Sequence, residues 1–190
     1  MNSFYSAEEL KALNLKLYGD NVLISRKSSI YGADKITIGN NVRIDDFCIL
    51  SVKYGEIIIG NFVQLTAYVS LYAGDSSIHL YDFVGIGTRT CVMATSDDYS
   101  GETMTNPMIP EKYKAVNSCP IIIKKHSIIG TGCTILPGVT IAEGCSFGAM
   151  TLINKNTEQW SIYVGIPAKK IKDRKRDLLI LEKAFHDEVE

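Results

Sequence analysis

Aliphatic residues recur every six positions along the C-terminal half of this chain. The series is Ile123, Ile129, Ile135, Ile141, Phe147 and Ile153, and shorter series of three begin at Ile38, Ile59 and Leu80. Helices repeat about every 3.6 residues and strands about every 2, so neither produces this period. A chain that turns a corner every six residues makes a three-sided coil of about eighteen residues, and such coils stack as parallel strands.

The departures from this interval follow every third unit. Leu50–Ile59 and Leu71–Leu80 each span nine residues, whereas Val92–Ile123 spans thirty-one. All extra residues therefore fall at one corner of the predicted prism, and residues 97–120 form an external loop there. Loops of this length in compact domains are usually functional or disordered.

Helical signals flank the repeats at both ends. Ser6 precedes an AEELKAL segment with Glu9 three residues on, which is a capping box, and Leu178, Leu181 and Phe185 follow helical spacing. We predict an N-terminal cap segment over residues 1–20, a β-helix over 21–168 and a C-terminal helix over 169–190. Gly165 and Pro167 should end the β pattern, and the two helices should cover the open edges of the coil.

Composition excludes several classes of protein. Hydrophobic residues make up 46% of the chain and charged residues 22%, with a net charge of -1, as in an ordinary soluble domain. The N-terminus lacks a secretory signal and no apolar run is long enough for a membrane span, so we expect a cytoplasmic protein. The five cysteines show no C-x-x-C pair, which argues against a disulfide framework or zinc site. Cys48, Cys133 and Cys145 share one repeat slot and should be small buried side chains.

The units IGTGCT, ILPGVT and IAEGCS, followed by GIPAKKIK, resemble the hexapeptide-repeat acyltransferases. This resemblance implies an all-β fold, the left-handed parallel β-helix. It also implies a homotrimer that binds acetyl-CoA in the cleft between adjacent prisms, with the long loop reaching a neighbouring subunit. The left hand comes from the resemblance alone, because parallel crossovers in general prefer the right hand.

Carried over by motif position, the resemblance implies a CoA site. It places Thr131 and Ala149 at the pantetheine arm, followed by Asn154 and Lys155 in the next coil, and Gly165 and Pro167 near the adenine. Lys169 and Lys172 would meet the CoA phosphates. For the remaining basic residues after Pro167 the alternatives are a solvated helix start and a nucleic-acid patch, which the slightly acidic chain disfavours. Gly130 belongs to the same predicted CoA site, and backbone N–H groups near Gly130 and Thr131 could stabilise an oxyanion.

The start of the long loop carries the candidate chemistry. The galactoside and antibiotic acetyltransferases of the family have a histidine where this chain has Ser96, so the usual general base is missing. A sugar hydroxyl needs such a base, whereas a sugar amine with a pKa near the roughly 7.7 to 8.0 of an α-amino group is partly neutral already. Asp97 and Asp98 could hold the amine and receive its proton, with His126 as the alternative acceptor. The other interpretations are an acidic turn for the aspartates and a solvated turn for His126.

A closer resemblance extends over nearly the whole chain. The blocks LISRKSSIYGADK, IGNNVRIDDFCILS and IIIKKHSIIG look like the nucleotide-sugar acetyltransferases that act on dTDP-4-amino-4,6-dideoxyglucose in O-antigen synthesis. This implies an acetyl-CoA-dependent N-acetyltransferase that needs no metal. The alternatives are a sugar or polysaccharide O-acetyltransferase and a non-catalytic β-helix scaffold. Asp45 and Asp46, in the IDDF block, are either acceptor-binding carboxylates or a polar corner.

Overall fold

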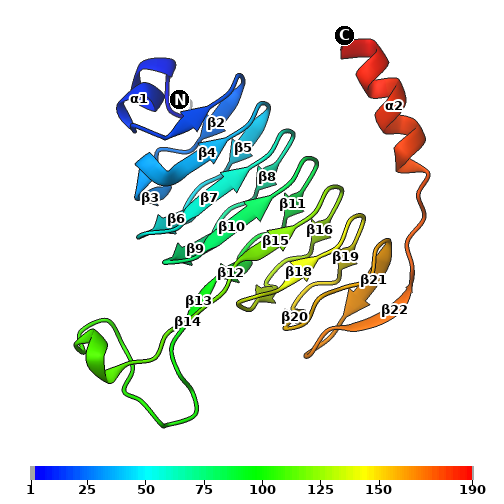
Figure 1. The fold of residues 1–190 in the computed structure, drawn as a ribbon. Helices are drawn as coiled ribbons and strands as arrows, with labels where there is room; N and C mark the ends of the chain where they lie inside the picture. The colour runs from blue at the N-terminus through cyan, green and yellow to red at the C-terminus, as the bar shows by residue number, and fades with distance from the viewer. Residues whose placement is uncertain (1–2, 190) are drawn as a thin grey trace.

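The computed structural model describes residues 3–189, which form a prism of stacked coils with a long loop at one edge (Figure 1). Each complete coil contributes one strand to each of three faces, and neighbouring coils pair as parallel strands. The predicted left-handed parallel β-helix is confirmed. Neither helix in the described residues is long and apolar enough to cross a membrane.

From β1 to β20, apart from the β13–β14 ribbon, the strands follow one another in rotation around the three faces. Face 1 contains β1 (Leu17–Tyr18), β4 (Ile36–Ile38), β7 (Glu56–Ile59), β10 (Ser77–Leu80), β15 (Ile121–Ile123) and β18 (Thr140–Ile141). Face 2 contains β2 (Val22–Ile24), β5 (Val42–Ile44), β8 (Gln64–Leu65), β11 (Gly85–Ile86), β16 (Ile128–Ile129), β19 (Ser146–Phe147), β21 (Ser161–Val164) and β22 (Lys169–Asp173). Face 3 contains β3 (Ser29–Tyr31), β6 (Ile49–Val52), β9 (Ser70–Gly74), β12 (Cys91–Met93), β17 (Thr134–Ile135) and β20 (Leu152–Ile153).

The residues of the six-residue series form columns inside the prism. Strand register places Ile38 beside Ile59, Ile59 beside Leu80, and Leu80 beside Ile123, and all four are buried. The three cysteines of the shared slot are also fully buried, as predicted, and burial raises the pKa of the Cys48 thiol to about 11. The core is therefore a stack of matching side chains, one from each coil.

At two of the three corners, nearly every coil turns through a residue with positive φ. We name each corner by the faces it joins. At corner 1–2 these residues are Asn21, Asn41, Phe62, Phe83, His126, Gly144 and Trp160, and at corner 2–3 they are Phe47, Tyr68, Arg89, Gly132 and Met150. Residues other than glycine rarely adopt this conformation, yet most of these positions hold large side chains. Because coils stack directly on one another, the corner side chains form two ladders along the prism.

The long excursion leaves the prism at corner 3–1, where the two nine-residue intervals also lie. It starts with an antiparallel ribbon of β13 (Thr95–Ser96) and β14 (Asn117–Ser118), and it contains the short 3₁₀ helix η2 (Glu111–Tyr113). A second 3₁₀ helix, η1 (Ala33–Lys35), occupies the same corner in the first coil. The insertions are thus confirmed at a single edge, and the loop projects away from the prism there (Figure 1).

The N-terminal end agrees with the sequence prediction. Helix α1 (Ala7–Ala12) has the expected capping box, in which Ser6 accepts from the Glu9 N–H and Glu9 accepts from the Ser6 N–H. Leu10 is buried against the core. The segment therefore packs on the first coil as a cap.

The C-terminal end differs from the prediction. The helix begins at Leu178, not at 169, because β22 (Lys169–Asp173) folds back antiparallel to β21 and occupies its free edge. Gly165 and Pro167 therefore do not end the β structure. Helix α2 (Leu178–Val189) packs instead on corner 1–2, where Phe185 contacts Phe62 and Phe83 edge-on.

Candidate functional site

Corner 2–3 of the C-terminal coils presents bare backbone. A Cβ atom at Gly87 would lie 2.7 Å from the Thr131 nitrogen, and one at Gly130 would lie 2.7 Å from the Ala149 nitrogen. Neither glycine can therefore carry a side chain without moving the next coil. Gly130, Thr131 and Ala149, all predicted to bind CoA, are brought together here in adjacent coils, and Gly165 continues the same corner after β21. We call these four residues the backbone strip.

Two amides of the backbone strip are unpaired within the described chain. The N–H groups of Thr131 and Ala149 have no hydrogen-bond acceptor among residues 3–189, whereas their neighbours Gly130 and Met150 donate to the coil ladder. The Gly130 N–H donates to the Phe147 carbonyl at 3.0 Å, so it cannot also serve the oxyanion predicted for it. The amides of Thr131 and Ala149 remain available to a ligand.

Asn154 and Lys155 do not belong to the backbone strip. They follow β20 and are exposed at corner 3–1, a different edge of the prism from Thr131 and Ala149. The prediction that they lie in the next coil of the strip was wrong, because one more strand separates the two corners. On the strip's own edge the following residues are Gly165 and Pro167.

The basic residues after Pro167 divide into two groups. Lys169 and Lys172 lie on β22, are exposed, and form no ion pair within the described residues. Lys170 instead bridges Glu158 and Asp173 at 2.8 and 2.9 Å.

Arg174 has a structural role. Its guanidinium donates to the carbonyl oxygens of His126, Gly144 and Cys145 in neighbouring coils. This residue and Lys170 are therefore not the solvated start of a helix, and only part of the basic cluster is free for an anion.

The acidic pair at the start of the loop also divides. Asp98 accepts hydrogen bonds from the N–H and hydroxyl groups of both Ser100 and Thr103, at 2.8 to 3.1 Å. Backbone and side-chain hydrogen bonds from Ser100, followed by that of Thr103, lower its pKa to about 2. Asp98 is consequently committed to holding the turn and is a poor proton acceptor.

Asp97 has the opposite character. Its side chain is exposed and makes no hydrogen bond or ion pair with other described residues. It lines two cavities of about 450 and 430 Å³ at the base of the loop, one shared with Tyr99 and Asn117 and the other with Lys53 and Lys114. Of the two aspartates, only Asp97 is free to meet a substrate.

His126 lies at corner 1–2, whereas the loop leaves the prism at corner 3–1. It occupies the positive-φ slot of corner 1–2 and stacks on Phe83 at 5.1 Å with an interplanar angle of 13°. Its Nε2 atom lies 2.9 Å from a Glu182 carboxylate oxygen on α2, and the residue is buried. The interpretation as a solvated turn was wrong, because α2 covers it. Within one chain the structure does not bring His126 to Asp97.

The N-terminal half of corner 2–3 carries polar and aromatic residues that the motifs alone did not identify. Phe47 and Tyr68 stack there with ring centroids 4.9 Å apart, and the Arg89 guanidinium lies 5.9 Å from the Tyr68 ring. An alignment of the repeats could have identified these residues. The third position after each inward-facing aliphatic residue holds a large side chain in these coils, although a turn at this position favours glycine or asparagine.

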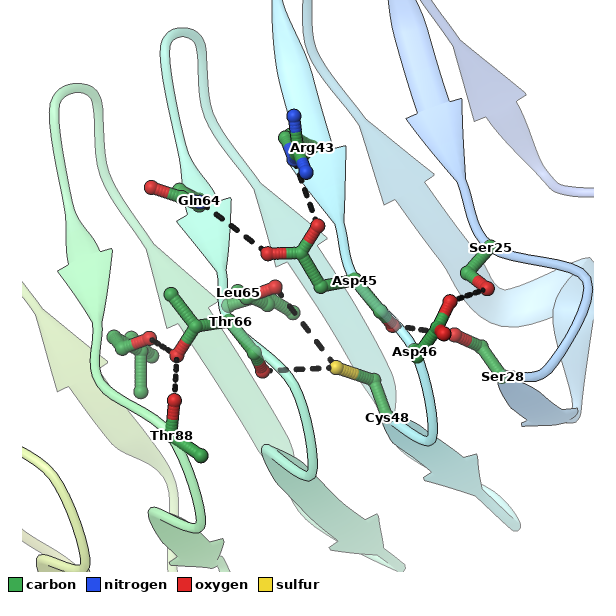
Figure 2. Close-up of polar contacts among 11 residues, drawn as sticks. Ser25, Ser28, Arg43, Asp45, Asp46, Cys48, Gln64, Leu65, Thr66 and Thr88 are labelled. Atoms are coloured by element: carbon green, nitrogen blue, oxygen red, sulfur yellow. Dashed lines mark hydrogen bonds and ion pairs between the residues drawn. The ribbon is translucent and has the colours of Figure 1, made fainter. Parts of the chain in front are cut away.

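Asp45 and Asp46 stabilise this corner. Figure 2 shows the Asp45 carboxylate between Arg43 and Gln64, and the Asp46 carboxylate directed at Ser25 of the preceding coil. Lys27 also pairs with Asp46 at 2.7 Å, and these contacts lower the pKa of the Asp46 carboxyl. The geometry supports the polar-corner interpretation of the IDDF block.

The candidate functional groups thus occupy two edges of one prism. The backbone strip lies at corner 2–3, whereas the free carboxylate of Asp97 lies at corner 3–1. Among residues 3–189 no cluster of three or more His, Cys, Asp or Glu side chains is arranged to hold a metal ion. Backbone amides and a carboxylate can position a ligand and accept a proton.

Comparison with known proteins gives close relatives, although no protein-family model matches the chain. It is 41% identical over 177 residues to the dTDP-4-amino-4,6-dideoxy-D-glucose acyltransferase of Escherichia coli, a match that covers 93% of this chain and 92% of the relative. It is 27% identical to a putative lipopolysaccharide biosynthesis O-acetyl transferase of E. coli K12, covering 85% of this chain and 80% of that protein.

Solved structures of an N-acyltransferase from Bacillus cereus, AntD, are similar along their whole length. The complex of AntD with dTDP and 3-hydroxybutyryl-CoA has a TM-score of 0.94 and 49% identity, covering 100% of this chain and 99% of AntD. A variant of AntD in complex with dTDP-4-amino-4,6-dideoxyglucose and coenzyme A gives a TM-score of 0.95, with 99% of each chain covered.

Proposed function

The chain belongs to the dTDP-4-amino-4,6-dideoxyglucose acyltransferases of the hexapeptide-repeat type, and from this membership we propose that it transfers an acetyl group from acetyl-CoA to the amine of that nucleotide-linked sugar. The observation that carries the proposal is the match along the whole chain to an N-acyltransferase whose structure holds both this sugar nucleotide and coenzyme A. The resemblance drawn from the sequence blocks is confirmed at the level of family and enzyme class.

The reaction is a direct acyl transfer. The neutral amine attacks the thioester carbonyl, the new C–N bond replaces the C–S bond, and the CoA thiolate leaves and is protonated. The amine must lose one proton, so a nearby base is sufficient and no activated hydroxyl is required. This agrees with the absence of a histidine at Ser96.

Asp97 is the proton acceptor in this proposal. It lies at the mouth of the loop cavities with a free carboxylate, whereas Asp98 is saturated by four hydrogen bonds. Asp98 keeps the turn in shape and thereby positions Asp97. His126 is part of the corner ladder beneath α2 and takes no part in the transfer.

Acetyl-CoA lies along the backbone strip in this proposal. The free N–H groups of Thr131 and Ala149 bind the pantetheine arm, and Gly165 with Pro167 borders the adenine. Lys169 and Lys172 meet the phosphates, because both are exposed on β22 and neither forms an ion pair with another described residue. The thioester then faces the coil that carries Arg89 and the start of the loop.

The active enzyme is a homotrimer in this proposal. Within one chain the loop and the backbone strip lie at different corners, so a site that contains both requires the loop of a second copy. Closed rings are the usual outcome when one surface patch of a chain binds a different patch of its neighbour. Light scattering at micromolar concentration should give the mass of three chains, and a monomer would contradict the shared site.

The biological setting we propose is the cytoplasmic synthesis of a surface polysaccharide such as O-antigen. The similarity to a putative lipopolysaccharide biosynthesis enzyme supports it, together with a nucleotide-activated substrate. Deleting the gene should remove the acylated amino sugar from the polysaccharide, and an unchanged polysaccharide would contradict this setting.

The acceptor is tested with purified protein, acetyl-CoA and matched pairs of dTDP-amino sugars and dTDP-hydroxy sugars. We expect turnover of dTDP-4-amino-4,6-dideoxyglucose and about 10² to 10⁴ times less with the hydroxy compound, because the site lacks the general base that a hydroxyl needs. A parallel series with 3-hydroxybutyryl-CoA identifies the acyl donor. Turnover of only the hydroxy sugars would establish an O-acetyltransferase, and no binding of any CoA thioester would establish a scaffold.

The catalytic assignment is tested with three variants. Asp97→Asn should lower kcat by about 10² to 10⁴ and leave acetyl-CoA binding unchanged, because it removes a base without altering the backbone strip. Asp98→Asn should instead increase proteolytic cleavage of the loop and raise KM for the sugar. His126→Phe should retain kcat, since phenylalanine fills the same slot in two other coils. Full activity of Asp97→Asn together with an inactive His126→Phe would move the base to His126.

The phosphate contacts are tested by titration calorimetry. Replacing Lys169 and Lys172 together by alanine should weaken acetyl-CoA binding by about tenfold or more, because a hydrogen bond to a charged group contributes about 1.5 to 3 kcal/mol. Acetyl-pantetheine, which lacks those phosphates, should bind the variant and the wild type equally. Lys175→Ala, at another exposed cation of the same segment, is the control. Unchanged acetyl-CoA affinity in the double variant would remove both lysines from the site.

A further inference from the structure

Strand β22, which carries Lys169 and Lys172, places no side chain in the core. All of its residues are exposed, and it pairs with β21 at the C-terminal end of the prism (Figure 1). Just before β22, Ala168 packs against the core and its N–H donates to the Leu152 carbonyl at 2.8 Å. Just after β22, the N–H of Arg174 donates to a carbonyl of the preceding coil. The strand is therefore fixed at both of its ends.

The pairing of β22 with β21 contains a bulge. Lys170 lies opposite Tyr163, whereas Lys172 lies opposite the adjacent residue Ile162, so Ile171 is the extra residue. β22 thus has one residue more than the stretch of β21 that it faces. Because both ends of β22 are fixed, the strand cannot slide into a regular register, and the extra residue stays in the middle.

The bulge places Lys169 and Lys172 on the same side of the sheet. Residues three apart on a regular strand point to opposite faces, whereas cross-strand neighbours point to the same face. The neighbours of the two lysines are Val164 and Ile162, which are alternate residues of β21 and lie on its outer face. Both lysines therefore face outward from the prism.

The other side of β22 has the matching arrangement. Lys170 and Asp173, which are also three residues apart, form an ion pair at 2.9 Å. Lys170 also reaches Glu158, whose N–H donates to the hydroxyl of the buried Tyr163. The inner side of the strand is therefore committed to ion pairs within the chain, and its outer side carries the two free ammonium groups.

Arg174 fixes the C-terminal end of β22 to corner 1–2. Its guanidinium donates to the carbonyl oxygens of His126, Gly144 and Cys145 at 2.7, 3.1 and 3.4 Å. Its N–H donates to the Trp160 carbonyl at 2.7 Å. Since His126, Gly144 and Trp160 are the positive-φ residues of three successive coils, this one side chain and its own amide bind the corner of all three.

This attachment requires a partly buried cation without a carboxylate partner. Among residues 169–177 only Arg174 is not exposed, and no aspartate or glutamate of the described chain forms an ion pair with it. Burial lowers the pKa of its guanidinium. Desolvating a cation is costly unless hydrogen bonds compensate, and here backbone carbonyls alone provide them. Arg174 therefore determines where β22 ends relative to the coils.

We infer that Arg174 is a positioning residue for the CoA phosphates, because it holds the bulge that turns Lys169 and Lys172 to one side. The inference rests on the proposed function, in which these two lysines meet the phosphates. Two ammonium groups on one side can bind phosphates of the same ligand, whereas on opposite sides only one could do so. Arg174 itself lies at corner 1–2, across face 2 from the backbone strip, and acts through β22.

Kinetics of Arg174→Ala with acetyl-CoA and with acetyl-pantetheine test the inference. We expect KM for acetyl-CoA to rise about tenfold, as when the lysine contacts are lost, with kcat within about twofold of wild type. Acetyl-pantetheine lacks those phosphates, so its kcat/KM should be unchanged, which also reports an intact prism. Arg174→Lys keeps the cation but has fewer donors, and its KM should rise less.

Arg176→Ala is the matched control. Arg176 is exposed, its guanidinium lies 5.5 Å from the Trp160 ring, and that guanidinium forms no hydrogen bond with a described residue. Its replacement should leave KM for acetyl-CoA unchanged. A rise in KM as large as that of Arg174→Ala would show that any lost cation of this segment has the same effect, and would overturn the inference.

A double-mutant cycle separates positioning from general stability. When Lys169 and Lys172 are both alanine, Arg174→Ala should change KM for acetyl-CoA by less than about twofold, because no lysine remains to be positioned. An equal rise with and without the lysines, or an equal loss with acetyl-pantetheine, would overturn the inference and leave the proposed function standing. If the wild type neither binds acetyl-CoA nor acetylates the amino sugar, the proposed function fails and this inference fails with it.

Discussion

The corner conformation is the constraint on which the rest of this structure depends. A coil can close a triangle within about eighteen residues only if the backbone turns sharply after each short strand, and here most coils do so through a positive φ at corners 1–2 and 2–3. Because every coil turns at the same points, equivalent side chains fall directly above one another. This direct stacking produces the buried columns, the two ladders and the bare glycine edge.

The two ladders show how one structural device can serve two purposes. At corner 1–2 the aromatic rings and His126 provide the surface on which α2 packs. Beside them, the Arg174 guanidinium donates hydrogen bonds to three carbonyl oxygens of neighbouring coils. At corner 2–3 no part of the described chain covers the rings. The same slot continues toward the C-terminus as glycine and methionine, next to the exposed amides of Thr131 and Ala149. One edge of the prism thus changes from side chains to backbone along its length.

The long loop carries an exposed carboxylate outside the prism, whereas the Asp45 and Asp46 carboxylates of corner 2–3 are paired. Asp97 is placed outside the prism by the β13–β14 ribbon, and the turn that carries it is held by Asp98. The two adjacent aspartates therefore differ in their surroundings: Asp98 is held by the turn, whereas the Asp97 carboxylate is exposed.

The sequence by itself determined the coil, its six-residue period and the single insertion corner, because each depends on spacing along the chain. It also identified the buried cysteine slot, the capping box at Ser6 and the family. Only the tertiary structure decided which side chains share an edge. Asn154 and Lys155 are close to Ala149 in sequence but one corner away, and His126 follows the loop directly yet is stacked beneath α2.

The distinction between Asp97 and Asp98 had the same origin, since it depends on hydrogen bonds to Ser100 and Thr103 that no periodicity encodes. The strand β22 and the late start of α2 also depended on tertiary structure, because an unpaired edge on β21 outweighed the local helical pattern. Spacing is a property of the chain alone, whereas adjacency across coils and the pairing of free edges arise only when the coils are stacked.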